Sequence, residues 1–282
     1  VETLTFDHLR EERGRYSRIR LWGSIGFIVA VLGTGAVLDV LPLTGVLWVC
    51  WGILAGILVL AAVLPDAPVV PHPLGSLPVA DILRQPRVRA LLAACFAMSA
   101  AHGALYVFYS IHLADNGYSK AEVGGLWSLG VLAEIVVFML MARLVQRYSL
   151  RLLLLASFAA AVLRFLLIGW GVESLTIMVL AQLMHGLTFG AYHAAAIAAV
   201  NLWFPGRAQG RGQALYSSIS FGAGGLLGGL ISGWTWDGIG AGWTYTLGSV
   251  FALIGFLLVW RWVRDPVAVD AASEAKTADP VP

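Results

Sequence analysis

Two charged side chains lie well inside long apolar segments of the chain. Glu134 and Arg164 are each flanked on both sides by more than two helical turns of uncharged residues. A charge near the middle of a bilayer costs roughly 2.5–3.5 kcal/mol on insertion scales, so such residues usually have a function. We predict that Glu134 takes up and releases a proton. Arg164 is predicted to bind an anionic substrate, because a guanidinium pairs with a carboxylate through two hydrogen bonds.

Histidines and aromatic residues extend this polar set. His185 and His193 are eight residues apart, which places them on one helix face about 12 Å apart at 1.5 Å per residue. That distance is too long for two ligands of one metal ion, so no metal site is expected. His102 and Tyr106 form another stripe. Burial raises the proton affinity of a carboxyl group, and a nearby arginine lowers it. A set of Glu, Arg and His can therefore bind and release a proton when the helices that carry them move.

These side chains need membrane helices to position them, and the composition predicts such helices. The 282 residues are 59% hydrophobic and 12% charged, whereas a soluble domain has about 25% charged residues. A net charge of +2 is too small for a nucleic-acid-binding protein. Cys50 and Cys95 lie in apolar runs and are expected to be packing residues.

Eight apolar runs are long enough to cross a bilayer, which predicts an all-α membrane protein. They lie at about 19–40, 43–64, 89–114, 121–142, 151–170, 174–200, 213–235 and 240–262. The proline-rich interval 65–88 is interpreted as a cytoplasmic linker. It divides residues 1–64, a remnant of one bundle, from a six-helix bundle at 89–264, and the polar tail 265–282 is expected to be disordered.

The basic residues predict the orientation of these spans. Arginines occur in alternate loops, and the loops between them hold only Lys120. The arginines are Arg10, Arg13, Arg15, Arg18 and Arg20; Arg84, Arg87 and Arg89; Arg143, Arg147 and Arg151; Arg207 and Arg211; and Arg261 and Arg264. Because positive loops face the cytoplasm, both ends of the chain and the linker are predicted to be cytoplasmic.

The arrangement of spans indicates a transporter with two repeated halves. On this interpretation four helices of the first half are missing, and the chain, which begins with Val, is a truncated form of a longer one. Glycines recur every four residues in the span 213–235, as Gly224 and Gly228 and as Gly225, Gly229 and Gly233. This spacing predicts close approach of a neighbouring helix backbone.

Several segments resemble the major facilitator superfamily, in the branch of lactose permease and the 3-phenylpropionic acid transporters. They read GRYSRIRLWGSIGF, GYSKAEVGGLWSLGVLAEIVVF, AVLRFLLIGW and QLMHGLTFGAYHAAA. The resemblance implies twelve helices in two bundles, of which eight are present. His102, Glu134, Arg164, His185 and His193 fall where the phenylpropionate transporters carry the same residues.

The resemblance to lactose permease also implies individual roles. Arg20 matches a substrate-contacting arginine of the fifth helix, and Glu2 matches a carboxylate at the end of the fourth. The alternative for Arg20 is a cytoplasmic anchor beside Arg18. Arg164 matches the intramembrane arginine of the ninth helix.

The tenth-helix histidine of lactose permease matches His185. The acid that follows it by three residues is replaced here by Thr188. The proton site therefore cannot be transferred. Glu134 is our candidate instead, with His185 or His193 second.

A further segment, ARLVQRYSLR, resembles a weakened form of the superfamily's G-x3-D-R-x-G-R-R loop. The resemblance implies a gating role for Arg147 and Arg151, which are retained. Gln146 stands in place of the acid.

We therefore predict a monomeric, multi-pass protein of the bacterial inner membrane that takes up a small aromatic carboxylate such as 3-phenylpropionate together with protons. The proton gradient supplies the energy, and no cofactor is expected. A sugar or a nucleoside is the alternative substrate, because fold does not determine function. An enzyme is disfavoured, since H-E-x-x-H, G-x-S-x-G and P-loop motifs do not occur. The predicted substrate contacts are Glu2, Arg20, His102, Tyr106, Trp127, Arg164 and Tyr192.

Overall fold

The computed structural model describes residues 19, 22–23, 25–30, 33, 42, 44–64 and 78–264. The chain divides into two compact units, residues 1–71 and 72–282, and each is considered by itself. The described residues form helices and connecting turns, without any strand, as predicted. Glu2, Arg20 and the tail 265–282 lie outside the described residues, and so does most of the predicted span 19–40.

The first unit contains one long described helix, α3 (Gly45–Val63). It coincides with the predicted span 43–64. Its 19 residues extend about 28 Å at 1.5 Å per residue, close to the thickness of a bilayer's hydrocarbon core. Its large apolar side chains, such as Trp48 and Leu58, are exposed.

Within residues 78–264, the described part of the second unit, six apolar segments are long enough to cross a membrane. These correspond to the six spans predicted after the linker, and most extend a few residues beyond the predicted limits. The elements are α4 (Val79–Arg84), α5 (Pro86–Ala101), α6 (Gly103–Asp115), α7 (Lys120–Arg147), α8 (Leu150–Trp170), α9 (Leu175–Leu183), η2 (Gly186–Ala191), α10 (Tyr192–Trp203), η3 (Gly206–Ala208), α11 (Gln209–Ser217), η4 (Ser218–Gly224), α12 (Gly225–Ile239) and α13 (Ala241–Trp262).

Local sequence explains where several helices begin. Helix α5 starts at Pro86, because the first turn of a helix tolerates a residue without an N–H. The last part of the proline-rich interval 65–88 is therefore helical, because it contains α4 and the start of α5. Helix α7 starts after Ser119, whose hydroxyl accepts from the Glu122 N–H while the Glu122 carboxylate accepts from the Ser119 N–H. This capping box satisfies backbone donors that the helix start leaves unpaired.

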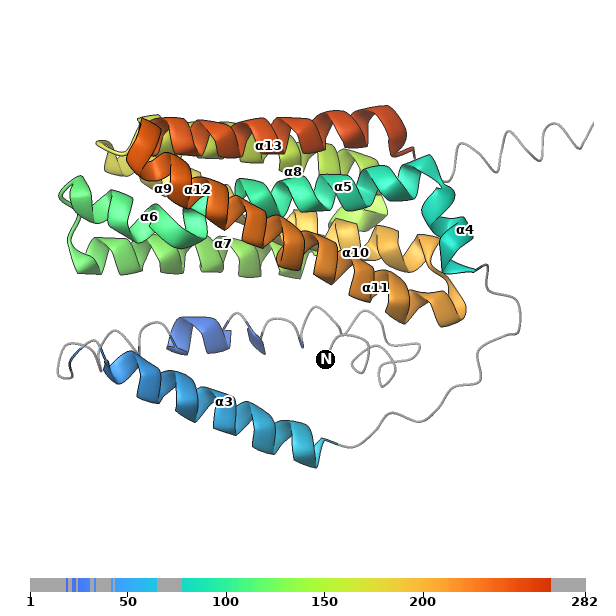
Figure 1. Ribbon diagram of the computed structural model, residues 1–282, viewed down its shortest axis with the longest axis horizontal. Helices are drawn as coiled ribbons and strands as arrows, with labels where there is room; N and C mark the ends of the chain where they lie inside the picture. Colours follow the sequence, from blue (N-terminus) through green and yellow to red (C-terminus); the bar gives the residue numbers. More distant parts are fainter. Residues whose placement is uncertain are drawn as a thin grey trace, which may run out of the picture. The chain divides into compact units, whose positions relative to one another are not determined.

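Helix α13 packs against α8 and α5, and the three lie side by side in Figure 1. Small residues allow this close approach. A side chain at Gly255 would overlap the Phe158 ring, and a Cβ at Gly248 would lie 2.9 Å from the Ala101 carbonyl oxygen. The Ser249 hydroxyl also donates to the Val162 carbonyl at 3.0 Å, which joins α13 to α8.

The glycine stripes in the fifth of these six segments have different surroundings. A Cβ at Gly224 would lie 2.6 Å from the Phe96 carbonyl oxygen, and one at Gly228 would overlap the backbone of Ala100. The predicted close approach is therefore confirmed for this pair, which faces α5. A Cβ at Gly225 or Gly233 would meet no atom of the described residues within 4 Å.

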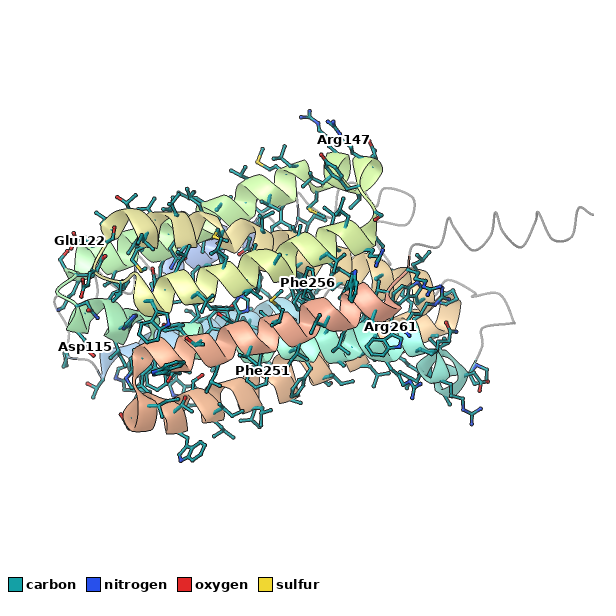
Figure 2. All side chains as sticks on the ribbon, turned by 90° about the horizontal axis from the view of Figure 1, so that it is seen from above. Asp115, Glu122, Arg147, Phe251, Phe256 and Arg261 are labelled. Atoms are coloured by element: carbon teal, nitrogen blue, oxygen red, sulfur yellow. The ribbon has the colours of Figure 1, made fainter. Side chains whose placement is uncertain are left out.

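Charged residues gather at opposite ends of the six-segment unit. In Figure 2, Arg147 and Arg261 lie at one end, and Asp115 and Glu122 lie at the other. Successive spans alternate in direction, so the loops that hold arginines share one end. This is the alternation that the sequence predicted.

We expect Gly228→Ala to destabilise the second unit, because the added methyl group meets the Ala100 backbone. Overpacking of this kind costs about 1–3 kcal/mol. Thermal unfolding of the detergent-solubilised protein measures it, with Gly233→Ala as the matched control in the same helix. Equal melting temperatures for the two variants would contradict this packing.

Candidate functional site

Three departures from regular α-helix surround one cavity of about 150 Å³ in the second unit. The first is a break at His102, between α5 and α6. The others are the π-helical segments η2 and η4, each of which contributes a phenylalanine, Phe189 and Phe221, to the cavity wall. Segments of π-helix are frequently found at functional sites. The cavity is therefore the candidate site.

Arg164 lies behind this wall and is completely buried. Its Nε donates to the Ala181 carbonyl at 2.8 Å, its Nη1 to the Thr188 hydroxyl at 2.9 Å and its Nη2 to the Gln182 side-chain oxygen at 3.2 Å. All three acceptors are uncharged and belong to α9 or η2. Because charge-assisted hydrogen bonds are stronger than neutral ones, Arg164 fixes this part of the chain against α8.

Glu134 and His185 form a buried acid–base pair. The Glu134 carboxylate oxygen lies 3.8 Å from His185 Nε2, and both residues are 6% exposed. Glycines bring their helices together: a Cβ at Gly186 would lie 2.7 Å from the Ala133 carbonyl oxygen, and one at Gly190 would touch the Glu134 backbone. The structure thus brings together two of the three residues predicted to carry a proton.

Gln182 joins Arg164 to the span that carries His185. Its side-chain oxygen accepts from Arg164 and lies 2.8 Å from where a Cβ of Gly130 would be. A side chain at Gly130 would require the Gln182 amide to move at this crossing with α7. His185 follows Gln182 by three residues and Gly130 precedes Glu134 by four, so Gln182 and the acid–base pair lie along the same helix crossing, while Arg164 reaches Gln182 from α8.

His193, the third predicted proton residue, has different partners. Its Nδ1 lies 3.0 Å from the Tyr216 hydroxyl. Its ring is parallel to that of Phe189, which is in turn parallel to His185, with ring centres 5.8 and 5.4 Å apart. The two histidines therefore share one stripe, as predicted. The Tyr216 contact directs His193 toward α11.

The predicted aromatic contacts lie around the break in the α5–α6 segment. His102 stacks on Tyr106 at 5.8 Å and meets His185 at 6.4 Å. Tyr106, which is 55% exposed, stacks on Trp127 at 6.5 Å. Tyr192 is buried and lines the cavity from α10. His102, Tyr106 and Tyr192 thus contribute to one wall, with Trp127 behind Tyr106.

The two arginines of the predicted gating loop have separate surroundings. Arg147 is exposed and lies over the Tyr148 ring at 5.7 Å. Arg151 donates to the Trp260 carbonyl at 2.8 Å, which joins the start of α8 to the end of α13. The contact between Arg151 and Trp260 could not be predicted from the sequence, because it depends on how α8 packs against α13.

Sequence reasoning missed a group of hydroxyls at the cavity. Ser99 and Ser220 lie 2.8 Å apart, and Ser220 donates to the Cys95 carbonyl at 3.0 Å. Serines are common in membrane helices, so composition does not mark these two. In residues 78–264 and the shorter described ranges, no cluster of three metal-binding side chains occurs.

A bundle of helices long and apolar enough to cross a membrane, with a buried arginine, an acid–base pair and a cavity inside it, is typical of a membrane transporter. Residues 1–247 match the MFS_1 like family, and the chain belongs to that family.

The chain is similar to named transporters. It is 32% identical over 212 residues to the "Probable 3-phenylpropionic acid transporter" of Escherichia coli (strain K12), covering 73% of this chain and 55% of that protein. It is 26% identical over 260 residues to the "Maltose permease" of Geobacillus stearothermophilus, covering 92% and 66%. The chain thus spans between 55% and 66% of the length of these relatives.

The fold is also similar to a crystal structure of a mutant of the nucleoside transporter NupG. The TM-score is 0.67 and the sequence identity is 18%, over 93% of this chain and 71% of that one. This likeness confirms the predicted major facilitator fold.

We expect Arg164→Met to destabilise the protein more than Arg147→Met does. The first change leaves the acceptors at Ala181, Gln182 and Thr188 without a donor, and each unsatisfied buried group costs about 1–3 kcal/mol. The measurement is the melting temperature of each variant in detergent, with the exposed Arg147 as the control for the buried Arg164. A melting temperature for Arg164→Met equal to that of Arg147→Met would show that these bonds contribute no stability.

Proposed function

We propose that the protein is a secondary active transporter that couples uptake of a small organic substrate to the entry of protons. The observation that supports this most is the buried Glu134–His185 pair beside the cavity. A carboxylate and an imidazole can exchange a proton, and a passive channel has no need of such a pair. Transport would proceed by alternating access of two helix bundles, as in other transporters built from repeats.

Coupling requires that substrate and proton affect the same structural element. Segment η2 meets this requirement, since Thr188 and Phe189 line the cavity while the Phe189 ring stacks on His185. A shift of η2 when substrate binds changes the distance between His185 and Glu134. Such a shift changes the affinity of the pair for a proton, because a nearby charge favours or disfavours the protonated form.

The proposed substrate is a small aromatic carboxylic acid such as 3-phenylpropionate. The cavity wall is mainly apolar, with Tyr106, Phe189 and Phe221 to flank a ring, and flat rings stack favourably on aromatic side chains. The similarity to the probable 3-phenylpropionic acid transporter supports this choice. Arg20 and Glu2, which lie outside the described residues, are proposed as further substrate contacts.

A sugar or nucleoside is the second candidate. The similarities to maltose permease and to NupG favour it, and the hydroxyls at the cavity could bind polyols. In either case we propose a monomer in the bacterial inner membrane with both ends of this chain in the cytoplasm, since alternate loops carry the arginines.

The experiment is uptake of labelled 3-phenylpropionate, maltose and uridine into cells that express the complete gene. We expect 3-phenylpropionate to accumulate, and a protonophore to abolish accumulation because it removes the gradient that drives transport. Cells with an empty vector are the control. If only maltose or uridine accumulates, the substrate is a sugar or a nucleoside and not an aromatic acid. Accumulation that resists the protonophore would contradict proton coupling.

A further inference from the structure

A second pocket lies at the arginine-rich end of the second unit, away from the candidate site. It has a volume of about 310 Å³ and is lined by Arg151, Trp260, Arg261 and Arg264. Arg151 is at the start of α8, and the other three residues are at or just beyond the end of α13. Figure 2 labels Arg261 at this end. Three guanidinium groups along one pocket favour an anionic ligand, and phosphate oxygens suit their planar donor geometry.

The contact between α8 and α13 builds one wall of this pocket. Arg151 Nη2 donates to the Trp260 carbonyl at 2.8 Å. Eleven residues further from this end on both helices, the Ser249 hydroxyl donates to the Val162 carbonyl at 3.0 Å. Because eleven residues make about three helical turns, both contacts lie on the faces that the two helices turn toward each other. The pocket is therefore the end of a packed helix seam, and Arg151 is fixed in its wall.

Positive charge is in excess around the pocket. The neighbouring stretches 140–152 and 241–264 contain arginines and no acidic residue. Asp265 follows Arg264 in the sequence and lies outside the described residues. One carboxylate cannot neutralise three guanidinium groups, so the residues that line the pocket attract an anion even with Asp265 beside them.

Toward the middle of α13, exposed apolar side chains continue the face that bears Arg264. Leu253, Leu257 and Trp260 are 45%, 47% and 57% exposed, and spacings of four and three residues place them on one stripe with Arg264. Tryptophan is enriched at the depth of lipid headgroups, which is where a pocket at the end of a membrane helix would lie. A ligand with both a phosphate and apolar chains would match the pocket and the stripe, whereas a soluble phosphate would match the pocket alone.

We propose that the end of the α8–α13 seam binds an anionic phospholipid, such as phosphatidylglycerol. Arg261 and Arg264 contact the lipid phosphate, Arg151 holds the wall beside them, and the acyl chains lie along the apolar stripe of α13. Basic pockets at the ends of membrane helices are a known way of binding anionic headgroups. This inference depends neither on the transported substrate nor on proton coupling.

The test measures lipid binding to the complete protein in detergent by native mass spectrometry, which resolves each bound lipid. Dissociation constants for the first bound lipid are compared for phosphatidylglycerol and phosphatidylcholine with the same acyl chains. We expect phosphatidylglycerol to bind about tenfold more tightly, because each arginine near an anionic lipid contributes roughly a fivefold gain and choline cancels the phosphate charge. Equal constants in the wild-type protein would overturn the proposal.

Paired variants distinguish a site from a generally basic surface. Arg261→Gln combined with Arg264→Gln should remove most of the preference for phosphatidylglycerol. The matched control is Arg143→Gln combined with Arg147→Gln, which removes two exposed arginines of α7 that do not line the pocket, and it should retain the preference. Lysine at positions 261 and 264 keeps the charges and should retain part of it. An equal loss in the α7 control would overturn the proposal.

Glycerol 1-phosphate separates a lipid from a soluble ligand, since it has the phosphate of the headgroup without the acyl chains. We expect it to bind far more weakly than phosphatidylglycerol. If the two bind equally well, the stripe contributes nothing, and the lipid is overturned as the ligand of this pocket in favour of a soluble phosphate.

Discussion

The second unit is organised around one constraint, which is that each nitrogen of an arginine buried among membrane helices needs a hydrogen-bond acceptor. Arg164 meets this constraint through Ala181, Gln182 and Thr188. The three acceptors come from one span, with Thr188 about two helical turns beyond Ala181 and Gln182, so these bonds fix that span against α8. The position of Thr188 in the cavity wall then follows. A burial cost of several kcal/mol per ion makes this arrangement sensitive to any change in the acceptors.

The same span carries the proposed proton chemistry. Between Gln182 and Tyr192 it passes from α-helix into π-helix. The hydrogen bonds of a π-turn reach one residue further than those of an α-helix, and such turns are frequent at functional sites. Because Thr188 contacts both the ion and the cavity, while His185 contacts Glu134, a shift in η2 connects ligand binding to the acid–base pair.

The sequence predicted the six spans after the linker and placed Glu134 and Arg164 inside them, because long apolar runs and the charges within them are visible without a fold. It could not predict which groups hold Arg164, since two acceptors are side chains and one is a backbone carbonyl from another helix. A regular periodicity of 3.6 also does not apply across η2. Likewise, Gly225 and Gly233 belong to a stripe that has the same four-residue repeat as the packed Gly224 and Gly228, and only the fold shows which stripe is covered.

The most direct test of the central claim, that Glu134 holds the coupling proton, compares Glu134→Gln with Glu122→Gln in proteoliposomes. Both replace a carboxylate on α7, one buried beside His185 and one exposed at the helix start. The account predicts that Glu134→Gln abolishes uphill uptake but retains exchange of substrate for substrate, while Glu122→Gln retains both. Uphill uptake that survives Glu134→Gln would contradict it.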